Sequence, residues 1–207
     1  MSPARAALLA LVAGACGQAE PPRPSVLLVS IDTLRADHVG LYGYERDTTP
    51  FLDSLGAEGL VFENAFTPAA WTLVAHMTML TGLNPKQHGV DRAERALSPD
   101  APLLAERLRA AGYQTLGFYR PGWIHPRHGF ERGFDVFQAH QTVEEAEAHL
   151  FEELARRSPE RPTFTFLHLF DVHNDPSSQE PPAPFSAPPP YQDVFQEGAR
   201  ASRARPT

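Results

Sequence analysis

The segment that most constrains the fold is a continuous apolar run at residues 25–31, with the sequence SVLLVSI, bounded by Pro24 and Asp32. A strand with one face in water alternates apolar and polar residues, whereas this run is almost entirely apolar and rich in β-branched side chains. Such a run is typical of a strand that is buried on both faces in a parallel sheet. We therefore expect a parallel sheet with helices covering both of its faces.

Helical and strand patterns alternate after this run. Helices are predicted at residues 49–59, 72–80, 98–111 and 142–157, and strands at residues 113–119 and 163–170. The third helix is expected to begin at Ser98 as its cap, with Pro99 in its first turn. The alternation predicts an α/β domain around a mainly parallel sheet. Ligands of such sheets bind beyond the carboxyl ends of the strands, where Asp32 and Asp171 lie.

The N-terminal residues 1–16 have the features of a secretory signal peptide: Arg5, a short apolar run at residues 6–12, and small residues before Cys16. Two kinds of processing fit this segment. The AGA sequence at residues 13–15 is a possible cleavage site, and a small residue before Cys16 also resembles a lipobox, in which that cysteine is acylated. Residues 17–24 then form a linker. We expect an exported bacterial protein, periplasmic or an outer-membrane lipoprotein, that meets the membrane only through the lipid.

Composition excludes some classes of partner and structure. The net charge of -7 and the lack of a Lys/Arg cluster argue against nucleic acid as a partner. Cys16 is the only cysteine, so no disulfide stabilises the domain. Seven of the 21 prolines fall at residues 176–190, which indicates a surface loop. We expect one folded domain at residues 25–195 and a low-complexity tail at residues 196–207.

Three residues near the predicted strand and helix ends are candidates for chemistry, each with a plainer alternative. Asp32 is placed to bind a hard cation, or else simply caps the following turn. Thr72 lies where helix N–H groups favour an anion, or else is an ordinary N-cap. His76 lies one turn later on the same helix face, or else is a packed or surface histidine.

Further candidates follow in two loops. Lys86 and His88 lie after the second helix, where they either approach an anion or remain solvated. The pair Asp171 and His173 leaves the last strand with both side chains on one side of an extended chain. His168, inside that strand, is expected to be packed.

The motifs together resemble the N-terminal part of sulfatases in the alkaline phosphatase superfamily. The matching segments occur in family order, and they are VLLVSIDTLRADHVG at residues 26–40 followed by YGY at 42–44, WTLVAH at 71–76, GF and GFD at 129–130 and 133–135, and DVH at 171–173. The resemblance implies an alkaline-phosphatase-like three-layer sandwich with a mainly parallel sheet. The fold is expected to be incomplete at its C-terminal side, because the later D-H or D-N pair of the family's metal site has no counterpart.

The resemblance also implies roles for particular residues. Asp32 is expected to bind a divalent metal, calcium first, with zinc or manganese as alternatives. Thr72 occupies the nucleophile position, and His173 would contact the sulfate or assist the leaving group. Of the modification signal C/S-x-P-x-R, the sequence TLVAH at 72–76 keeps no residue, so formylglycine is not expected at Thr72. His76 completes the catalytic candidates, while Lys86, His88 and Arg120 are candidates for substrate binding.

Three functions remain open at this point. The first is a metal-dependent hydrolase of sulfate esters, impaired in this chain. The second is a phosphoester hydrolase or phosphotransferase that uses a threonine nucleophile. The third is a non-catalytic exported lipoprotein.

Overall fold

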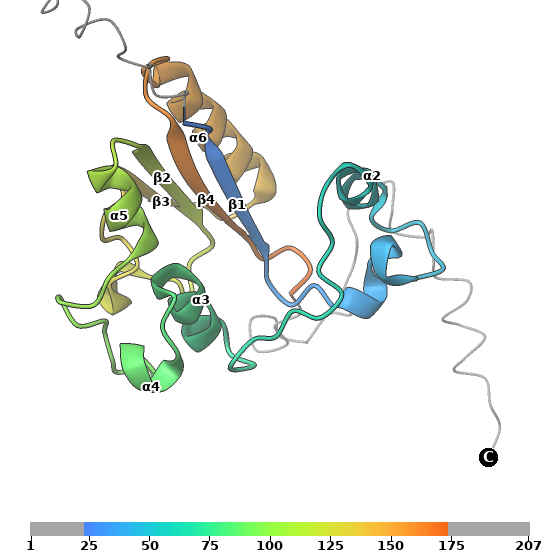
Figure 1. Ribbon diagram of the computed structural model, residues 1–207, viewed down its shortest axis with the longest axis horizontal. Helices are drawn as coiled ribbons and strands as arrows, with labels where there is room; N and C mark the ends of the chain where they lie inside the picture. Colours follow the sequence, from blue (N-terminus) through green and yellow to red (C-terminus); the bar gives the residue numbers. More distant parts are fainter. Residues whose placement is uncertain (1–22, 174–207) are drawn as a thin grey trace, which may run out of the picture. The chain divides into compact units, whose positions relative to one another are not determined.

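The computed structural model describes residues 23–173, and its centre is a four-stranded sheet in the order β1-β4-β2-β3 (Figure 1). The strands are β1 (Val26–Ile31), β2 (Gln114–Tyr119), β3 (Val136–Ala139) and β4 (Thr163–Leu169). The helices are α2 (Pro50–Glu58), α3 (Thr72–Thr81), α4 (Pro85–His88), α5 (Leu104–Ala110) and α6 (Val143–Arg156), with short 3-10 turns η1 (Ala36–His38), η2 (Gly40–Tyr42) and η3 (Pro126–His128).

The chain forms two compact units. Of the described residues, unit 1 comprises 23–30 and Thr67–Leu167, and therefore holds most of the sheet with α3 to α6. Unit 2 comprises Ile31–Phe66 and 168–173, and holds η1, η2 and α2. Each unit is described below by itself.

The sheet is parallel, as the alternation of helices and strands predicted. Strand β2 pairs in parallel with β3, where Leu116 lies opposite Val136, and with β4, where Gln114 lies opposite Thr163. Strands β1 and β4 also run in the same direction. The N–H of Thr163 donates to the Ser25 hydroxyl (3.0 Å) where both strands begin, and the N–H of Asp32 donates to the Leu169 carbonyl (2.9 Å) where both end.

Helices cover both faces of the central strands, with α3 and α5 on one side and α6 on the other (Figure 1). Phe164 and Phe166 of β4 are fully buried in one apolar core with Leu73 and Met77 of α3 and Leu103 before α5. Thr163 and Thr165, which alternate with these phenylalanines, are also buried. The helix–sheet–helix arrangement confirms the predicted layered α/β fold.

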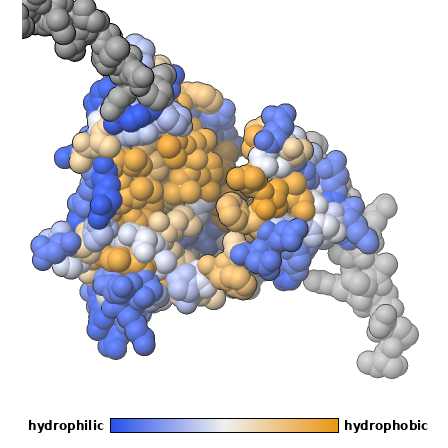
Figure 2. All heavy atoms as spheres, in the orientation of Figure 1, coloured by the Kyte–Doolittle hydropathy of each residue, from blue (hydrophilic) through white to orange (hydrophobic). Residues whose placement is uncertain are grey.

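The expectation that residues 25–31 are buried on both faces is wrong for the described structure. Val26, Leu27 and Val29 of β1 are 40%, 60% and 43% exposed. The reason is the place of β1 at the end of the strand order, where only β4 flanks it among residues 23–173. Figure 2 shows apolar residues gathered on the surface that carries this strand. An apolar edge of this kind promotes self-association, so we expect low solubility.

The helix predicted at residues 98–111 begins later than expected, at Leu104. Pro102 explains the delay, because a proline disfavours helical backbone in the residue before it and cannot donate a helical hydrogen bond. The guanidinium of Arg132 holds the preceding turn instead, by donating to the carbonyls of Ser98 (2.8 Å), Pro99 (3.0 Å) and Ala101 (2.9 Å). Ser98 therefore lies in a bonded turn and does not cap the helix.

Candidate functional site

Asp32 lies directly after β1, at the carboxyl end of the sheet, as the sequence predicted. Its Oδ2 is 3.3 Å from Nε2 of His168, the penultimate residue of β4. The side chains of Asp32 and His168 are only 10% and 2% exposed. His168 was expected to be packed, and the structure adds that its ring nitrogen faces the candidate metal ligand.

The residue after Asp32 has an unusual backbone. Thr33 has φ 60, which places a β-branched residue in the left-handed region, and it is the only non-glycine residue with positive φ among those described. Such a conformation costs about 1–3 kcal/mol and persists only where the surroundings impose it. Strain of this kind is often found beside functional residues, and here it lies directly after Asp32.

Thr72 is the first residue of α3, and the helix cap is Trp71. The alternative in which Thr72 is the N-cap is therefore wrong. Thr72 is the first residue of a ten-residue helix, at the positive end of the helix dipole, where the first-turn N–H groups have no partner within the helix itself. These are the features that favour a tetrahedral anion at a helix start.

His76 links the first turn of α3 to the end of β1. Its Nδ1 is 2.8 Å from the Thr72 carbonyl oxygen, and its Nε2 is 2.8 Å from the Ser30 hydroxyl. Because a carbonyl only accepts, Nδ1 carries a proton and donates it to the Thr72 carbonyl oxygen, which leaves Nε2 for the Ser30 hydroxyl. The ring is 5% exposed and meets Phe166 edge-on, with centroids 6.4 Å apart. Sequence reasoning missed Ser30 because no local pattern distinguishes it from other strand residues.

His88 was expected in a loop, where it would either approach an anion or remain solvated. The structure places it in α4, 3% exposed. Its Nδ1 accepts from the Val90 N–H (3.0 Å), and its Nε2 lies 3.2 Å from the Thr78 hydroxyl. Both ring nitrogens are thus used inside the protein, which argues against the expected substrate contact. Lys86 lies in the same short helix, near its last residues.

Burial lowers the pKa of His88 below its usual value, because the charged imidazolium is poorly solvated there. The unfolded chain therefore binds a proton more readily than the folded one. The stability that neutral His88 contributes is present above the unfolded pKa of about 6.5 and is lost as the pH falls through the folded value. We expect His88→Asn, which keeps an acceptor for Val90, to flatten this acid-side decline. Urea unfolding between pH 7.5 and 5 would measure it, and an unchanged slope would contradict the assignment.

The remaining candidates are dispersed. Residues 170–173 form a turn in which the His173 N–H donates to the Phe170 carbonyl (3.0 Å), so the extended arrangement expected for Asp171 and His173 is wrong. The His173 ring stacks on Phe170, with centroids 3.9 Å apart. In unit 1, the Arg120 guanidinium donates to the side-chain amide oxygen of Gln141.

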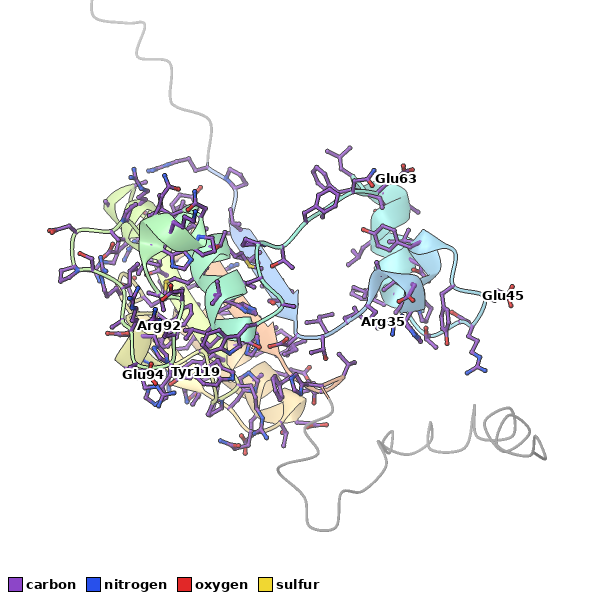
Figure 3. The ribbon with its side chains drawn as sticks, turned by 90° about the horizontal axis from the view of Figure 1, so that it is seen from below. Arg35, Glu45, Glu63, Arg92, Glu94 and Tyr119 are labelled. Carbon is purple, nitrogen blue, oxygen red and sulfur yellow. The ribbon has the colours of Figure 1, made fainter. Side chains whose placement is uncertain are left out.

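Unit 2 also contains a cavity of about 550 Å³, which is large enough for an organic group. Thr33, Leu34, Leu52 and Val172 are among its lining residues. Arg35, labelled in Figure 3, lies at its wall and is paired with Asp37 through two hydrogen bonds of 2.8 Å and 2.5 Å.

The structure thus brings the candidates together in two sets. Ser30, Thr72 and His76 are bonded to one another in unit 1, and Asp32 and His168 lie together in unit 2. A carboxylate and an imidazole are each possible ligands of a divalent ion. Within residues 23–173, however, no three His, Cys, Asp or Glu side chains are grouped closely enough to hold one, and the Asp32–His168 contact is a hydrogen bond.

Two expectations concern the membrane. Cys16, with the rest of the predicted leader, lies outside the described residues. No helix within the described part of the chain combines the length and apolar character needed to cross a bilayer.

Known proteins are similar to this chain in sequence and in fold. Arylsulfatase A from Bos taurus is 33% identical over 140 residues, covering 61% of this chain and 28% of the relative. An arylsulfatase from Clostridium perfringens is 34% identical over 94 residues, covering 45% of this chain and 20% of the relative. The phosphonate monoester hydrolase of Agrobacterium radiobacter has a similar fold, with a TM-score of 0.67 and 22% identity over 83% of this chain and 44% of that structure.

The extent of these matches differs between the chain and its relatives. The chain spans less than a third of the length of either arylsulfatase. A family model described as Sulfatase matches residues 24–205, which is nearly the whole chain and includes every motif that carried the resemblance. The fold, the ordered motifs and this match lead to one conclusion: the chain belongs to the sulfatase family.

Proposed function

We propose that this chain is the nucleophile-bearing part of a metal-dependent hydrolase of sulfate esters. The observation that carries the proposal is the position of Thr72 as the first residue of α3, beside the N–H groups of the first helical turn. In the family, this position holds the attacking group. The names of the arylsulfatase relatives agree with a sulfate ester as the substrate.

The residues of unit 1 would bind and orient the anion. The first-turn N–H groups of α3 donate to the ester's sulfate oxygens, and His76 holds this turn through the Thr72 carbonyl. A divalent ion bound at Asp32 would supply charge stabilisation for the attacked group. His173 is proposed to contact the sulfate or the leaving group, while Lys86 and Arg120 are proposed as further anion contacts.

The number of candidate metal ligands leads us to propose low activity in this chain. Calcium prefers six to eight oxygen ligands, and zinc sites usually have at least three protein ligands. Within residues 23–173, Asp32 and His168 fall short of either set. We therefore propose that the 207-residue chain turns over sulfate esters poorly unless further ligands are supplied.

The chemistry of Thr72 favours a second candidate, phosphoester hydrolysis or phosphotransfer. Oxidation of the secondary alcohol of threonine gives a ketone, so Thr72 cannot form the aldehyde of formylglycine. It can attack phosphorus directly. The Thr72 hydroxyl oxygen bonds to phosphorus, its proton passes to water, and the ester oxygen leaves with the bonding pair and is protonated. Water then cleaves the phosphothreonine to phosphate and free Thr72.

The test uses intact-mass measurement to detect a covalent adduct on Thr72. The chain is incubated with an aryl sulfate or an aryl phosphate in calcium, zinc or manganese, and both adduct and turnover are measured. We expect Thr72→Ala to lose turnover by about a hundredfold or more, as removal of a nucleophile does. Thr81→Ala, at the other end of α3, is the matched control and should retain turnover.

The outcomes separate the three functions. Turnover of the sulfate ester that depends on Thr72 supports the first proposal, and a phosphate adduct on Thr72 supports the second. Unchanged turnover in Thr72→Ala removes Thr72 as the nucleophile. If neither turnover nor an adduct occurs with any metal, the chain is better described as non-catalytic. Export and acylation at Cys16 are separate proposals, tested by radiolabelled fatty acid incorporation into the wild type and Cys16→Ser.

A further inference from the structure

We propose that Trp123 and Arg127 select the ester that this chain binds. Trp123 would contact a ring in the part of the ester that leaves, and Arg127 would bind a negatively charged group on that ring. The inference rests on the proposed function in one respect, because it takes the start of α3 as the place where the sulfate binds. Thr72, Trp123 and Arg127 all belong to unit 1.

Trp123 is separated from the start of α3 by one side chain. Its indole contacts that of Trp71, with ring centroids 4.9 Å apart and an interplanar angle of 85°. Trp71 is the cap of α3 and directly precedes Thr72, and its carbonyl accepts from the Ala75 N–H (3.0 Å). Trp123 also follows β2, whose last residue is Tyr119, and ligands of parallel sheets bind beyond the carboxyl ends of the strands. A group bound at Thr72 therefore has the indole of Trp123 as a near neighbour.

The indole of Trp123 is only partly used in packing. It is 37% exposed, whereas the next residue, Ile124, is fully buried in the core. An aromatic side chain that packs on another ring and still reaches solvent offers apolar contact area, and its few rotatable bonds keep the entropy cost of binding low. Single exposed aromatic residues are common on protein surfaces, but here Arg127 adds a second feature.

Arg127 places an oriented positive charge beside this indole. Its guanidinium carbon lies 5.9 Å from the centre of the Trp123 ring, and its side chain is exposed. Its Nε donates to Nε2 of His128 (2.9 Å), a residue that is 1% exposed and whose Nδ1 donates to the Arg95 carbonyl (2.7 Å). The buried imidazole therefore orients the guanidinium. The two terminal nitrogens of Arg127 have no hydrogen-bond or ion-pair partner within residues 23–173.

The two side chains together fit a ring that carries a negative charge. The indole suits the flat apolar face of an aromatic or a pyranose ring, and the guanidinium presents paired N–H donors that match a carboxylate or a second sulfate. The sulfate that is attacked would bind at the N–H groups of the first turn of α3, so the ring belongs to the alcohol or phenol part of the ester. A simple alkyl ester offers neither contact.

The experiment measures the binding of four sulfate esters to the full chain by ligand-observed NMR titration. They are ethyl sulfate, phenyl sulfate, glucose 6-sulfate and 4-carboxyphenyl sulfate. We expect at least one of the two uncharged rings to bind about two- to tenfold more tightly than ethyl sulfate, and the tighter of them identifies the kind of ring. The added carboxylate should tighten binding of the phenyl ester about two- to fivefold. Trp123→Leu should remove the first difference, and Arg127→Gln the second.

The controls are Phe151→Leu and Arg109→Gln, which change an exposed aromatic residue of α6 and an exposed arginine of α5. Both should leave the two affinity ratios unchanged. Trp123→Tyr keeps an aromatic ring and should retain most of the ring preference, whereas a purely structural loss would weaken all four esters alike. Equal binding of ring and alkyl esters by the wild type, or a ring preference that survives in Trp123→Leu, would overturn the proposal. Should Trp123→Leu fail to fold, magnetisation transfer between ligand ring protons and the Trp123 indole of the wild type decides instead, and its absence refutes the contact.

The failure of this inference can be told apart from that of the proposed function. The titrations measure binding without turnover, and they can be repeated on Thr72→Ala, which keeps the main-chain N–H groups of the helix start. If Thr72→Ala shows unchanged turnover and also keeps both affinity ratios, Thr72 is not the nucleophile and the roles of Trp123 and Arg127 still stand. If turnover depends on Thr72 but the ratios are equal to one, the selection by Trp123 and Arg127 alone is refuted.

Discussion

Replacing Gly133 with alanine is expected to destabilise unit 1 by about 2–5 kcal/mol, because two separate costs coincide there. Gly133 has φ +83, a left-handed conformation that costs a residue with a Cβ about 1–2 kcal/mol. The added Cβ would also lie 2.2 Å from the Glu106 backbone nitrogen, and backbone cannot give way as a flexible side chain can. Urea unfolding followed by tryptophan fluorescence measures the loss.

Gly82 separates the two costs and is the matched control. It has φ +70 at the end of α3, but a Cβ there would meet nothing within 4 Å. Gly82→Ala should therefore cost only the conformational part, about 1–2 kcal/mol. Equal effects of the two substitutions would show that the approach of Gly133 to α5 has no energetic weight. The GFD motif at residues 133–135 would then need another explanation.

Sequence patterns predicted helix starts correctly where the stabilising contacts join residues that are close in the sequence. Pro50 begins α2, and the Thr142 hydroxyl accepts from the Glu145 N–H at the start of α6. Both helix starts can be read from neighbouring residues. The predicted start of α5 was wrong because a favourable cap at Ser98 competes with Pro102 and Arg132. Arg132 lies 34 residues after Ser98 in the sequence and donates to its carbonyl. Only the folded chain shows which of these wins.

The residues of the candidate site show the same difference between local signals and partners that are distant in the sequence. Asp32 and Thr72 were found because each follows a local signal, the end of an apolar strand and the start of a helix. Ser30 and His168 were not assigned, since their partners lie 46 and 136 residues away in the sequence. An apolar run also cannot reveal how many strands flank it. The run that predicted burial on both faces thus belongs to a strand whose side chains are 40–60% exposed at Val26, Leu27 and Val29.

Phe166→Ala is expected to cost about 3–5 kcal/mol, which is comparable to the whole stability of a marginal domain. Phe166 is fully buried in the middle of β4, in the core that includes Leu73 and Met77 of α3. Its ring also supports the edge of His76, whose imidazole holds the first turn of α3. The cavity left behind should therefore loosen the position of Thr72 as well as the core. Urea unfolding followed by the fluorescence of Trp71 and Trp123 gives the loss in stability.

Phe151→Ala is the control, because it removes the same side chain from α6 where it is 59% exposed. We expect that substitution to change the unfolding free energy by less than about 1 kcal/mol. Phe166→Leu, which keeps most of the apolar volume, should fall between the two. If Phe166→Ala and Phe151→Ala shift the midpoint equally, β4 is not the centre of the core. The link from β4 through His76 to the start of α3 would then lose its physical basis.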